Sequence, residues 1–372
     1  PEMAPDLPSE RPETGELVAN QHQILATEFP TISLRAMPKM AYGAGGLTDL
    51  LLAMAPVVPS RLPDVVAIDT AELGQLVAAG LAAPLDALLP PSLWDDLYPF
   101  ALDAATFDDN LYGLPFQADI IFLAYNSGLL ETPPRTWDEL LAAQATLLLP
   151  AAQGDGSAAD AFLIHYLARG GRLAKPPTAL DSAIAAKVLR DYRTTLEAGV
   201  LPQQVRDLQT LEECWSVYLS GGAVMTHVGS WQYLRDQALL KRARFAAIPT
   251  PGGETVTLAR SWSWVIVAQD AERRQAAARY LITMADSQWL GQWSAISYHL
   301  PTRRSSLVAI EDEEFRAFVE DQLLHASPYP ASPIYPQMQA VLARAVEDVL
   351  DGITTPERAA ISAAAAISRL GP

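Results

Sequence analysis

The sequence predicts an α/β protein with two lobes. The chain has 372 residues, which is more than one hydrophobic core usually supports, and half of these residues are apolar. Residues 48–80 show three segments in turn: a helical segment, the buried-strand sequence PDVVAID and the amphipathic helix AELGQLVAAG. This alternation of helix and strand is typical of an open α/β sheet.

The elements of the N-terminal part follow from simple patterns. We expect a helix over residues 15–28, a short strand over 32–36 after Pro30, and a helix over 48–54. Gly80 is expected to end the helix that follows the PDVVAID strand, because glycine adopts the left-handed conformation needed there.

The stretch at 111–141, LYGLPFQADIIFLAYNSGLLETPPRTWDELL, carries the strongest local signals. Pro115 restricts the residue before it to extended geometry, so 111–115 is expected to be extended. Residues 119–125 form a continuous apolar strand pattern. Thr136 and Glu139 form a capping box, in which each side chain accepts a hydrogen bond from the other residue's backbone amide.

Helical patterns dominate the rest of the chain, with three further strands between them. Asp270 and Ser287 are expected to cap helices, Gly352 to end one, and Pro356 to begin the last. The expected helices cover 157–169, 181–198, 209–221, 271–285, 312–325 and 336–351, and a helix opens at 229–231; the expected strands cover 223–227, 245–248 and 262–268.

Composition excludes several classes of function. The formal net charge of −17 disfavours binding to the phosphate backbone of nucleic acids. The best apolar run, around 47–58, is too short to span a membrane and is broken by Pro56. Cys214 is the only cysteine, so the chain can form no internal disulfide, and a buried structural thiol is expected.

Motifs of catalysis and metal binding are absent from the sequence. The five histidines are scattered, and the sequence contains no HExxH, GxSxG, Walker A or GxGxxG pattern. The acidic run 311–314 is expected to be a solvated helix start, with a calcium site as the remote alternative. We therefore expect no cofactor and no metal. The sequence begins with a Pro-rich stretch, PEMAPDLPSERPE, which does not resemble a signal segment. We expect this beginning to be a processed or trimmed start.

Several phrases together resemble the extracellular solute-binding proteins of ABC importers, in the sugar-binding, maltose-binding-protein-like branch. These are LYPF followed by DNLYGLP, LLETPPRTWDELL, YLSGGAVMTHVGSW, HLPTRR and YPQMQAVLARAVEDVLDG. The resemblance spans about 15–370; each motif is weak alone, and their order and spacing are fairly specific.

The resemblance implies the periplasmic-binding-protein fold, type II-like, with a ligand cleft between two lobes joined by crossing segments. Lobe one would comprise 1–111 and 258–305, and lobe two 115–255 and 309–372. Hinges would lie near 112–114, 256–261 and 300–308, with Gly113 absorbing backbone rotation.

Two departures from the family pattern stand out. The chain begins after the position of the first strand that the family normally shows. Arg260 and Ser261 stand where the family often has two glycines before an aromatic residue.

Sugars present apolar C–H faces and many hydroxyls, so aromatic platforms and carboxylate, amide and arginine side chains suit them. By resemblance, Trp231 would be the stacking platform, or otherwise a core tryptophan at a helix start; Ser230 would donate to ligand or be a plain N-cap. Gln117 and Asp119 follow the first hinge and would contact ligand, with a strand-end cap as the alternative for Asp119.

Further candidates come from strand ends and crossings. Asp69 would touch ligand or cap the next helix, because ligands of open α/β sheets bind at the carboxyl ends of strands. Trp262 and Trp264 face the same side of one strand, and Trp262 is the expected platform of the two, with the core as its alternative. Arg260 and Arg303 would bind hydroxyls or an anionic group, or form interlobe salt bridges.

Some positions remain as minor candidates. Lys39 follows the first expected strand, and Tyr298 and His299 flank the third crossing. His165 and Tyr166 lie on an expected helix of lobe two, where helix packing is the favoured role.

The resulting hypothesis is a monomeric binding protein and not an enzyme. It would capture a carbohydrate by cleft closure outside the cytoplasm, at the periplasm or as a lipid-anchored protein of the cell surface, and deliver it to ABC transporter permease subunits. Three alternatives stay open. The same fold could bind a phosphorylated polyol or a uronate; Asp119 could belong to a glycosidase carboxylate pair; or the protein could have lost its ligand and act as a sensor or scaffold.

Overall fold

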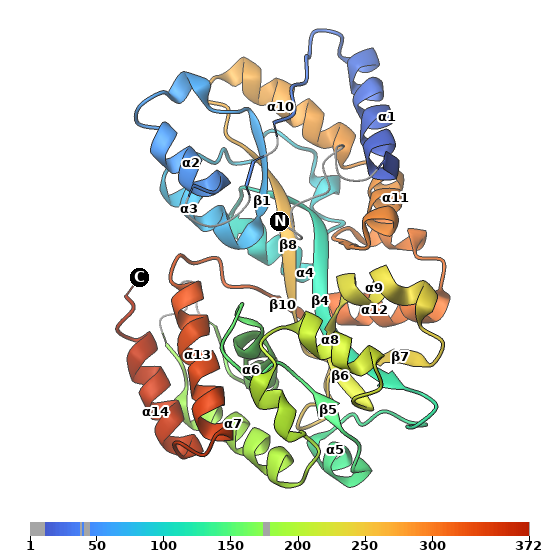
Figure 1. Cartoon of the computed structure of the whole chain (residues 1–372). Coiled ribbons are helices and arrows are strands. Elements are labelled where there is room, and N and C mark those ends of the chain that lie inside the picture. Colours follow the sequence, from blue (N-terminus) through green and yellow to red (C-terminus); the bar gives the residue numbers. More distant parts are fainter. Residues whose placement is uncertain (1–11, 38, 41–44, 174–178, 372) are drawn as a thin grey trace. The chain divides into compact units, whose positions relative to one another are not determined.

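The computed structural model describes residues 12–37, 39–40, 45–173 and 179–371. The chain divides into two compact units: unit 1 comprises the residues up to Asp119 and 260–324, and unit 2 comprises 120–259 and 325–372. Two long strands, β4 (Leu114–Asn126) and β8 (Thr257–Ile266), each run from one unit into the other (Figure 1). The expected α/β class and two-lobed organisation are confirmed.

The boundaries between the units differ in part from the expected lobes. They fall at 119–120, 259–260 and 324–325. The second boundary lies within the expected hinge at 256–261. The first and third lie later in the chain than the expected hinges at 112–114 and 300–308, because the start of β4 and helix α12 (Glu313–His325) pack with unit 1. Whether the chain bends at any of these points stays a prediction.

Strands β1 (Val65–Asp69), β8, β4 and β9 (Leu300–Pro301) form the sheet of unit 1. β1 is the expected PDVVAID strand, and it pairs antiparallel with β8 so that Asp69 lies opposite Trp262. β9 pairs antiparallel with β4, with Gln117 opposite Pro301. A short hairpin joins β2 (Thr106–Phe107) to β3 (Asn110–Leu111), and both of its turn residues have positive φ.

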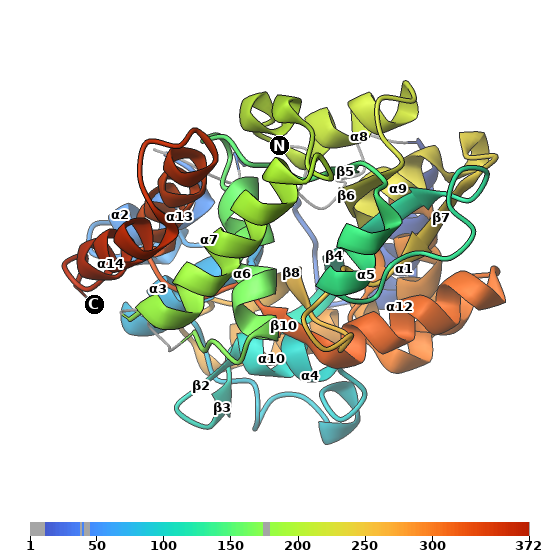
Figure 2. The same cartoon turned by 90° about the horizontal axis from the view of Figure 1, so that it is seen from below.

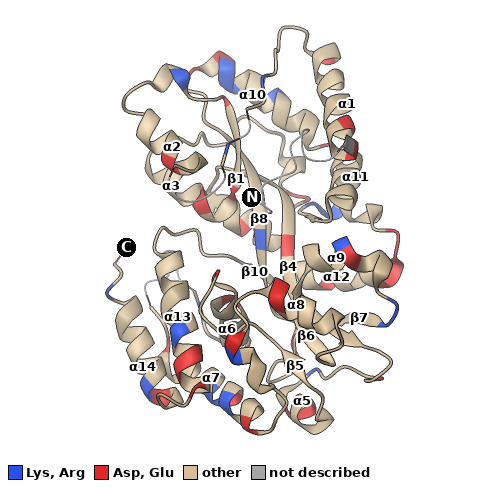
Figure 3. Cartoon of the chain, viewed as in Figure 1, with Lys and Arg blue, Asp and Glu red and all other residues tan. Residues whose placement is uncertain are grey.

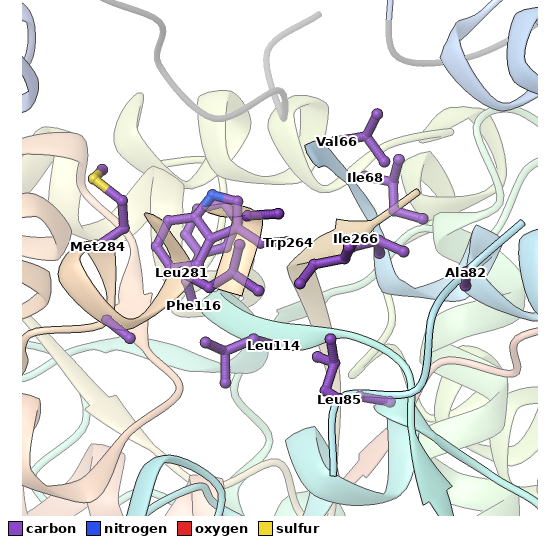
Figure 4. Close-up of a cluster of buried hydrophobic side chains, with 14 of the residues drawn as sticks. Val66, Ile68, Ala82, Leu85, Leu114, Phe116, Trp264, Ile266, Leu281 and Met284 are labelled. Atoms are coloured by element: carbon purple, nitrogen blue, oxygen red, sulfur yellow. The ribbon is translucent and has the colours of Figure 1, made fainter. Parts of the chain in front are cut away.

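The core of unit 1 lies between this sheet and the helices around it. Side chains from β1, β4 and β8, among them Ile68, Phe116 and Trp264, pack against Leu281 and Met284 of a covering helix (Figure 4). The rings of Phe116 and Trp264 stack with their centroids 4.1 Å apart. The helices of unit 1, besides α12, are α1 (Pro12–Glu28), α2 (Leu47–Met54), α3 (Leu73–Ala78), α4 (Pro99–Ala105), α10 (Ala271–Met284) and α11 (Ser287–Ser297).

Strands of unit 2 flank the second half of β4. β6 (Met225–Gly229) and β7 (Ala243–Ala246) pair antiparallel with β4, and β5 (Leu147–Leu148) pairs parallel with β6. β10 (Ala326–Pro328) pairs parallel with the first residues of β8. The helices of unit 2 are α5 (Trp137–Ala143), α6 (Ser157–Ala168), α7 (Ser182–Glu197), α8 (Leu211–Leu219), α9 (Ser230–Asp236), α13 (Tyr335–Leu350) and α14 (Pro356–Ile367).

Helices α6, α7, α13 and α14 pack together on one side of unit 2 (Figure 2). Asp160 of α6 joins two of them, because its carboxylate accepts hydrogen bonds from the hydroxyls of Tyr329 and Tyr335, each at 2.9 Å, and from Nε2 of Gln339 at 2.8 Å. A buried carboxylate needs such donors to offset its desolvation. Asp160 therefore ties α6 to α13 and to the segment before it.

Several expected helix ends are confirmed. The capping box of Thr136 and Glu139 is formed, and Asp270 caps α10. Gly352, with φ of 73°, follows α13 as expected, and Pro356 is the first residue of α14. Ser287 was expected to cap α11, but the cap is Asp286, whose carboxylate accepts from the amide of Trp289; Ser287 is the first residue of the helix.

The strand expected at 32–36 is wrong. Residues 32–37 have no regular structure, and apart from the half-buried Ile32 their side chains are exposed. A strand needs a paired neighbour and a face to bury, and this segment has neither among the described residues.

Charged residues are spread over both units (Figure 3). All four residues of the acidic run at 311–314 are exposed, and α12 begins within it, as expected. In the described part of the chain, no helix has the length and apolar character needed to cross a membrane.

Candidate functional site

Asp69 and Arg260 form an ion pair in unit 1. Asp69 ends β1 and is 3% exposed, and its carboxylate accepts a hydrogen bond of 2.9 Å from the amide of Ala71. It also accepts one of 2.6 Å from Nε of Arg260, on β8. Asp69 therefore caps the short helical turn that follows it, Thr70–Glu72, which is the alternative that the sequence offered. The salt bridge offered for Arg260 is also formed, but with a residue of the same unit.

Hydroxyl groups beside this ion pair bond to one another. The Oγ1 atom of Thr70 lies 2.7 Å from Oγ of Ser263 and accepts from Oγ of Ser261 at 2.9 Å. All three side chains are buried. Ser261, which stands where the family often has glycine, thus turns its hydroxyl into unit 1.

Both tryptophans of β8 belong to the core of unit 1. Trp262 is 3% exposed and Trp264 is 6% exposed. A ligand can stack only on a ring face that is open to it. The burial of Trp262 favours the core role that the sequence offered as its alternative, and its role as a platform stays a prediction.

The first half of β4, which belongs to unit 1, carries Gln117 and Asp119. Gln117 is completely buried, and its Oε1 accepts from the indole nitrogen of Trp293 at 3.4 Å. Oδ2 of Asp119 lies 2.9 Å from Nδ1 of His299, whose side chain is buried. His299, a minor candidate, thus positions the Asp119 carboxylate, while the burial of Gln117 favours a structural role.

Arg303 is held inside unit 1. Its side chain is almost buried, and Nε donates to Oδ2 of Asp96 at 2.9 Å. A second guanidinium nitrogen donates to the carbonyl of Ala285. Burial and these partners favour the salt-bridge role over ligand binding. Lys39, in contrast, is exposed and lies in an irregular segment.

Trp231 and Ser230 begin α9 in unit 2. Trp231 is half-buried and is not enclosed in a core. Ser230 is completely buried, and its Oγ accepts a hydrogen bond of 3.1 Å from the amide of Ile120 on β4. The cap position of α9 is Gly229 and not Ser230. Ser230 therefore fastens the start of the helix to the sheet, and Trp231 is the more accessible of the two residues.

Arg235 was missed by the sequence reasoning. Its guanidinium carbon lies 4.7 Å from the centroid of the Trp231 ring. The signal was present in the sequence, because residues four apart on a helix lie on one face. Asp96 was also missed, and no local signal links it to Arg303, which lies 207 positions further along the chain.

A group of buried rings lies in the core of unit 2. His165 donates to or accepts from the Tyr192 hydroxyl at 2.7 Å, and its ring centroid lies 5.8 Å from that of His227. Burial lowers the pKa of His165 well below its usual value and that of His227 to about 3. His165 and Tyr166 are both buried, which confirms the helix-packing role favoured for them.

A pocket of about 160 Å³ opens on unit 2, and none of the predicted site residues lines it. It is lined by Trp137, Asp138, Leu141, Arg169, Asp191, Thr194, Thr195 and Pro251. Asp191 pairs there with Arg169, and burial raises the pKa of its carboxyl group. Within the described ranges, no group of three or more histidine, cysteine or acidic side chains could hold a metal ion.

Comparisons with known proteins agree with this fold. Residues 41–317 match the model of a family described as bacterial extracellular solute-binding protein. A cyclic α-maltosyl-1,6-maltose binding protein from Arthrobacter globiformis is similar in structure, with a TM-score of 0.78, 21% identity, and coverage of 95% of this chain and 96% of that one. The sugar-binding protein MalE from Xanthomonas citri has a TM-score of 0.79, 19% identity, and coverage of 96% and 94%.

One curated relative is matched over a short region. A maltotriose-binding protein from Pyrococcus abyssi is 34% identical over 68 residues, which is 18% of this chain and 15% of that protein. At these levels of identity, the solved structures show the fold of this chain and not its ligand.

Proposed function

Because the chain belongs to the bacterial extracellular solute-binding protein family, we propose that it binds a neutral carbohydrate and delivers it to an ABC importer. An extracellular family implies a location outside the cytoplasm. Its structural relatives include a cyclic α-maltosyl-1,6-maltose binding protein and the sugar-binding protein MalE, which supports a carbohydrate as the ligand class. The permease partner, the monomeric state and a lipid anchor stay predictions.

One observation carries the proposal: Trp231 presents a half-buried indole at the start of α9. An indole held with part of its surface open suits the apolar C–H face of a sugar ring. Trp262, the other expected platform, is buried in a core. Of the two expected platform tryptophans, Trp231 is therefore the one that is not enclosed in a core.

The two candidate arginines favour a neutral ligand over an anionic one. Arg260 is paired with Asp69 and Arg303 with Asp96. Each guanidinium charge is already balanced by an aspartate, so a phosphate or a carboxylate bound beside it would also meet the negative charge of that aspartate, which is unfavourable. This disfavours the phosphorylated polyol and the uronate that the sequence left open.

Catalysis is not part of the proposal. Asp119 is the carboxylate that a glycosidase reading would use, and its Oδ2 is engaged by His299. A glycosidase needs a second carboxylate across the sugar, one of the pair acting as an acid. Prolonged incubation with maltotriose and chromatographic analysis for shorter sugars would reveal hydrolysis, and product formation would contradict the assignment as a binding protein.

A thermal-shift screen tests the ligand class. Its panel would contain maltose, maltotriose and other neutral sugars, with glycerol 3-phosphate and glucuronate as anionic compounds. A ligand at a hundred times its Kd stabilises the protein by about 2.7 kcal/mol, which gives a readable shift. We expect shifts with neutral sugars only. Shifts with the anionic compounds alone would overturn the neutral assignment, and no shift with any compound would favour a protein without a sugar ligand.

A further inference from the structure

Trp231 is covered on one ring face by a cation from its own helix. Arg235 lies one turn after Trp231 on α9, and its guanidinium carbon is 4.7 Å from the centroid of the indole. This distance is within the range of a cation–π interaction. A ligand that stacks on Trp231 must therefore use the opposite face of the ring.

The guanidinium of Arg235 is itself fixed by two carboxylates. Nε donates to Oδ1 of Asp236 at 3.0 Å, and one terminal nitrogen donates to Oδ2 of Asp236 at 2.7 Å. The terminal nitrogens also donate to the two carboxylate oxygens of Glu212, on α8, at 3.3 and 3.1 Å. Bidentate pairs of this kind hold the plane of a guanidinium as well as its position.

The carboxylate of Asp236 is anchored to the core of unit 2. Oδ2 of Asp236 accepts a hydrogen bond of 2.7 Å from the indole nitrogen of Trp215, which is completely buried on α8. Hydrogen bonding from Arg235 lowers the pKa of Asp236, so this carboxylate stays ionised at neutral pH. A continuous series of contacts thus runs from the buried Trp215, through Asp236 and Arg235, to the half-buried Trp231.

We propose that Arg235 is a positioning residue, which holds the Trp231 indole in one orientation so that its opposite face is ready to stack on the sugar. The inference rests on the function proposed above. An aromatic side chain immobilised before binding has no rotamer freedom left to lose when the ligand arrives. Arg235 contributes to affinity through Trp231 and makes no contact with ligand of its own.

A double-mutant cycle with maltotriose tests the proposal by isothermal titration calorimetry. We expect Arg235→Ala to weaken binding by about three- to tenfold, because the ligand would then have to order the Trp231 side chain when it binds. Arg235→Lys keeps a cation but loses the bidentate pairs, so it should recover part of the affinity. In the Trp231→Ala background, Arg235→Ala should have no further effect, because no ring remains to be positioned.

Arg344→Ala is the matched control. Like Arg235, Arg344 is a helical arginine paired with a carboxylate. Its partner is Asp348, four residues later on α13, and the Arg344 side chain is largely exposed. This control should bind maltotriose as the unsubstituted protein does. A second readout follows the ring itself: in protein labelled with 5-fluorotryptophan, the Trp231 resonance, assigned with Trp231→Phe, should shift or broaden in Arg235→Ala and stay unchanged in Arg344→Ala.

Each failure has its own signature. Unchanged affinity in Trp231→Ala would remove the stacking site and hence the basis of the proposed function. A second outcome would overturn the positioning role alone. In it, Trp231→Ala weakens binding, whereas Arg235→Ala keeps full affinity and leaves the Trp231 resonance unchanged. An Arg235→Ala effect of equal size in both backgrounds would mean that Arg235 acts on the ligand directly, which also contradicts the proposal.

Discussion

Lowering the pH should destabilise unit 2 because a histidine is buried there without a hydrogen-bond partner. His227 lies in the middle of β6, opposite Leu123 of β4, and none of its surface is exposed. Neither ring nitrogen has a hydrogen-bond partner among the described residues. Burial lowers the pKa of His227 to about 3, so the folded protein keeps this ring neutral well below pH 6.5.

The direction of the effect follows from proton binding. Between pH 6.5 and about 3, the unfolded chain binds a proton at this ring and the folded chain does not. The free energy of unfolding therefore falls as the pH is lowered through this window. One group loses about 1.4 kcal/mol per pH unit, so His227 alone should lower the free energy of unfolding by about 2 kcal/mol between pH 7.5 and pH 5. His165, whose pKa is also lowered by burial, should add to this loss.

Urea denaturation at pH 7.5 and pH 5.0 measures the loss. His227→Leu replaces the ring with an apolar side chain of similar volume, and it should lose about 2 kcal/mol less than the unsubstituted protein over this interval. His325→Gln is the matched control, because His325 is exposed at the end of α12, and it should keep the full pH dependence. Equal losses in His227→Leu and in the unsubstituted protein would refute the reasoning.

Three further substitutions probe unit 1, unit 2 and the ligand class. Gly113→Ala should lower the free energy of unfolding by about 1–3 kcal/mol in urea titrations, because the new Cβ would lie 2.9 Å from Cδ2 of Leu73 and 3.0 Å from Cβ of Ser263; unchanged stability would mean that these neighbours move aside at little cost. Asp160→Ala should cost about 1–3 kcal/mol or more by the same assay, since two tyrosine hydroxyls and a glutamine amide lose their acceptor, and a smaller loss would show that water replaces it. Asp69→Asn removes the counter-charge of Arg260 and should create weak binding of glycerol 3-phosphate in calorimetry; continued absence of binding would show that Arg260 does not face a ligand.

Local features of the sequence predicted much of the fold. The capping box at Thr136, the cap at Asp270 and the glycine at 352 each depend on a few neighbouring residues, and all three are formed. The failures have a different origin. The strand expected at 32–36 would have needed a partner elsewhere in the chain, and Asp286 and Ser287 are both good capping residues, so that only the folded geometry distinguishes them.

The candidate site was less predictable because exposure and pairing depend on tertiary contacts. Nothing in the local sequence distinguishes the buried Trp262 from the half-buried Trp231. Salt bridges were among the alternatives offered for Arg260 and Arg303, but their partners lie 191 and 207 positions away, so the identity of these partners could not be foreseen. Arg235 is the exception, since its spacing from Trp231 on a helix was visible in the sequence.

Isothermal titration calorimetry with maltotriose, on the unsubstituted protein and on Trp231→Ala, tests the central claim most directly. Trp94→Ala is the matched control, because Trp94 is also half-buried but lies in unit 1 and packs partly against its core. The account predicts saturable binding that is abolished or strongly weakened in Trp231→Ala and kept in Trp94→Ala. Binding of equal strength in all three proteins would contradict the stacking site, and binding of glycerol 3-phosphate in place of maltotriose would contradict the neutral carbohydrate.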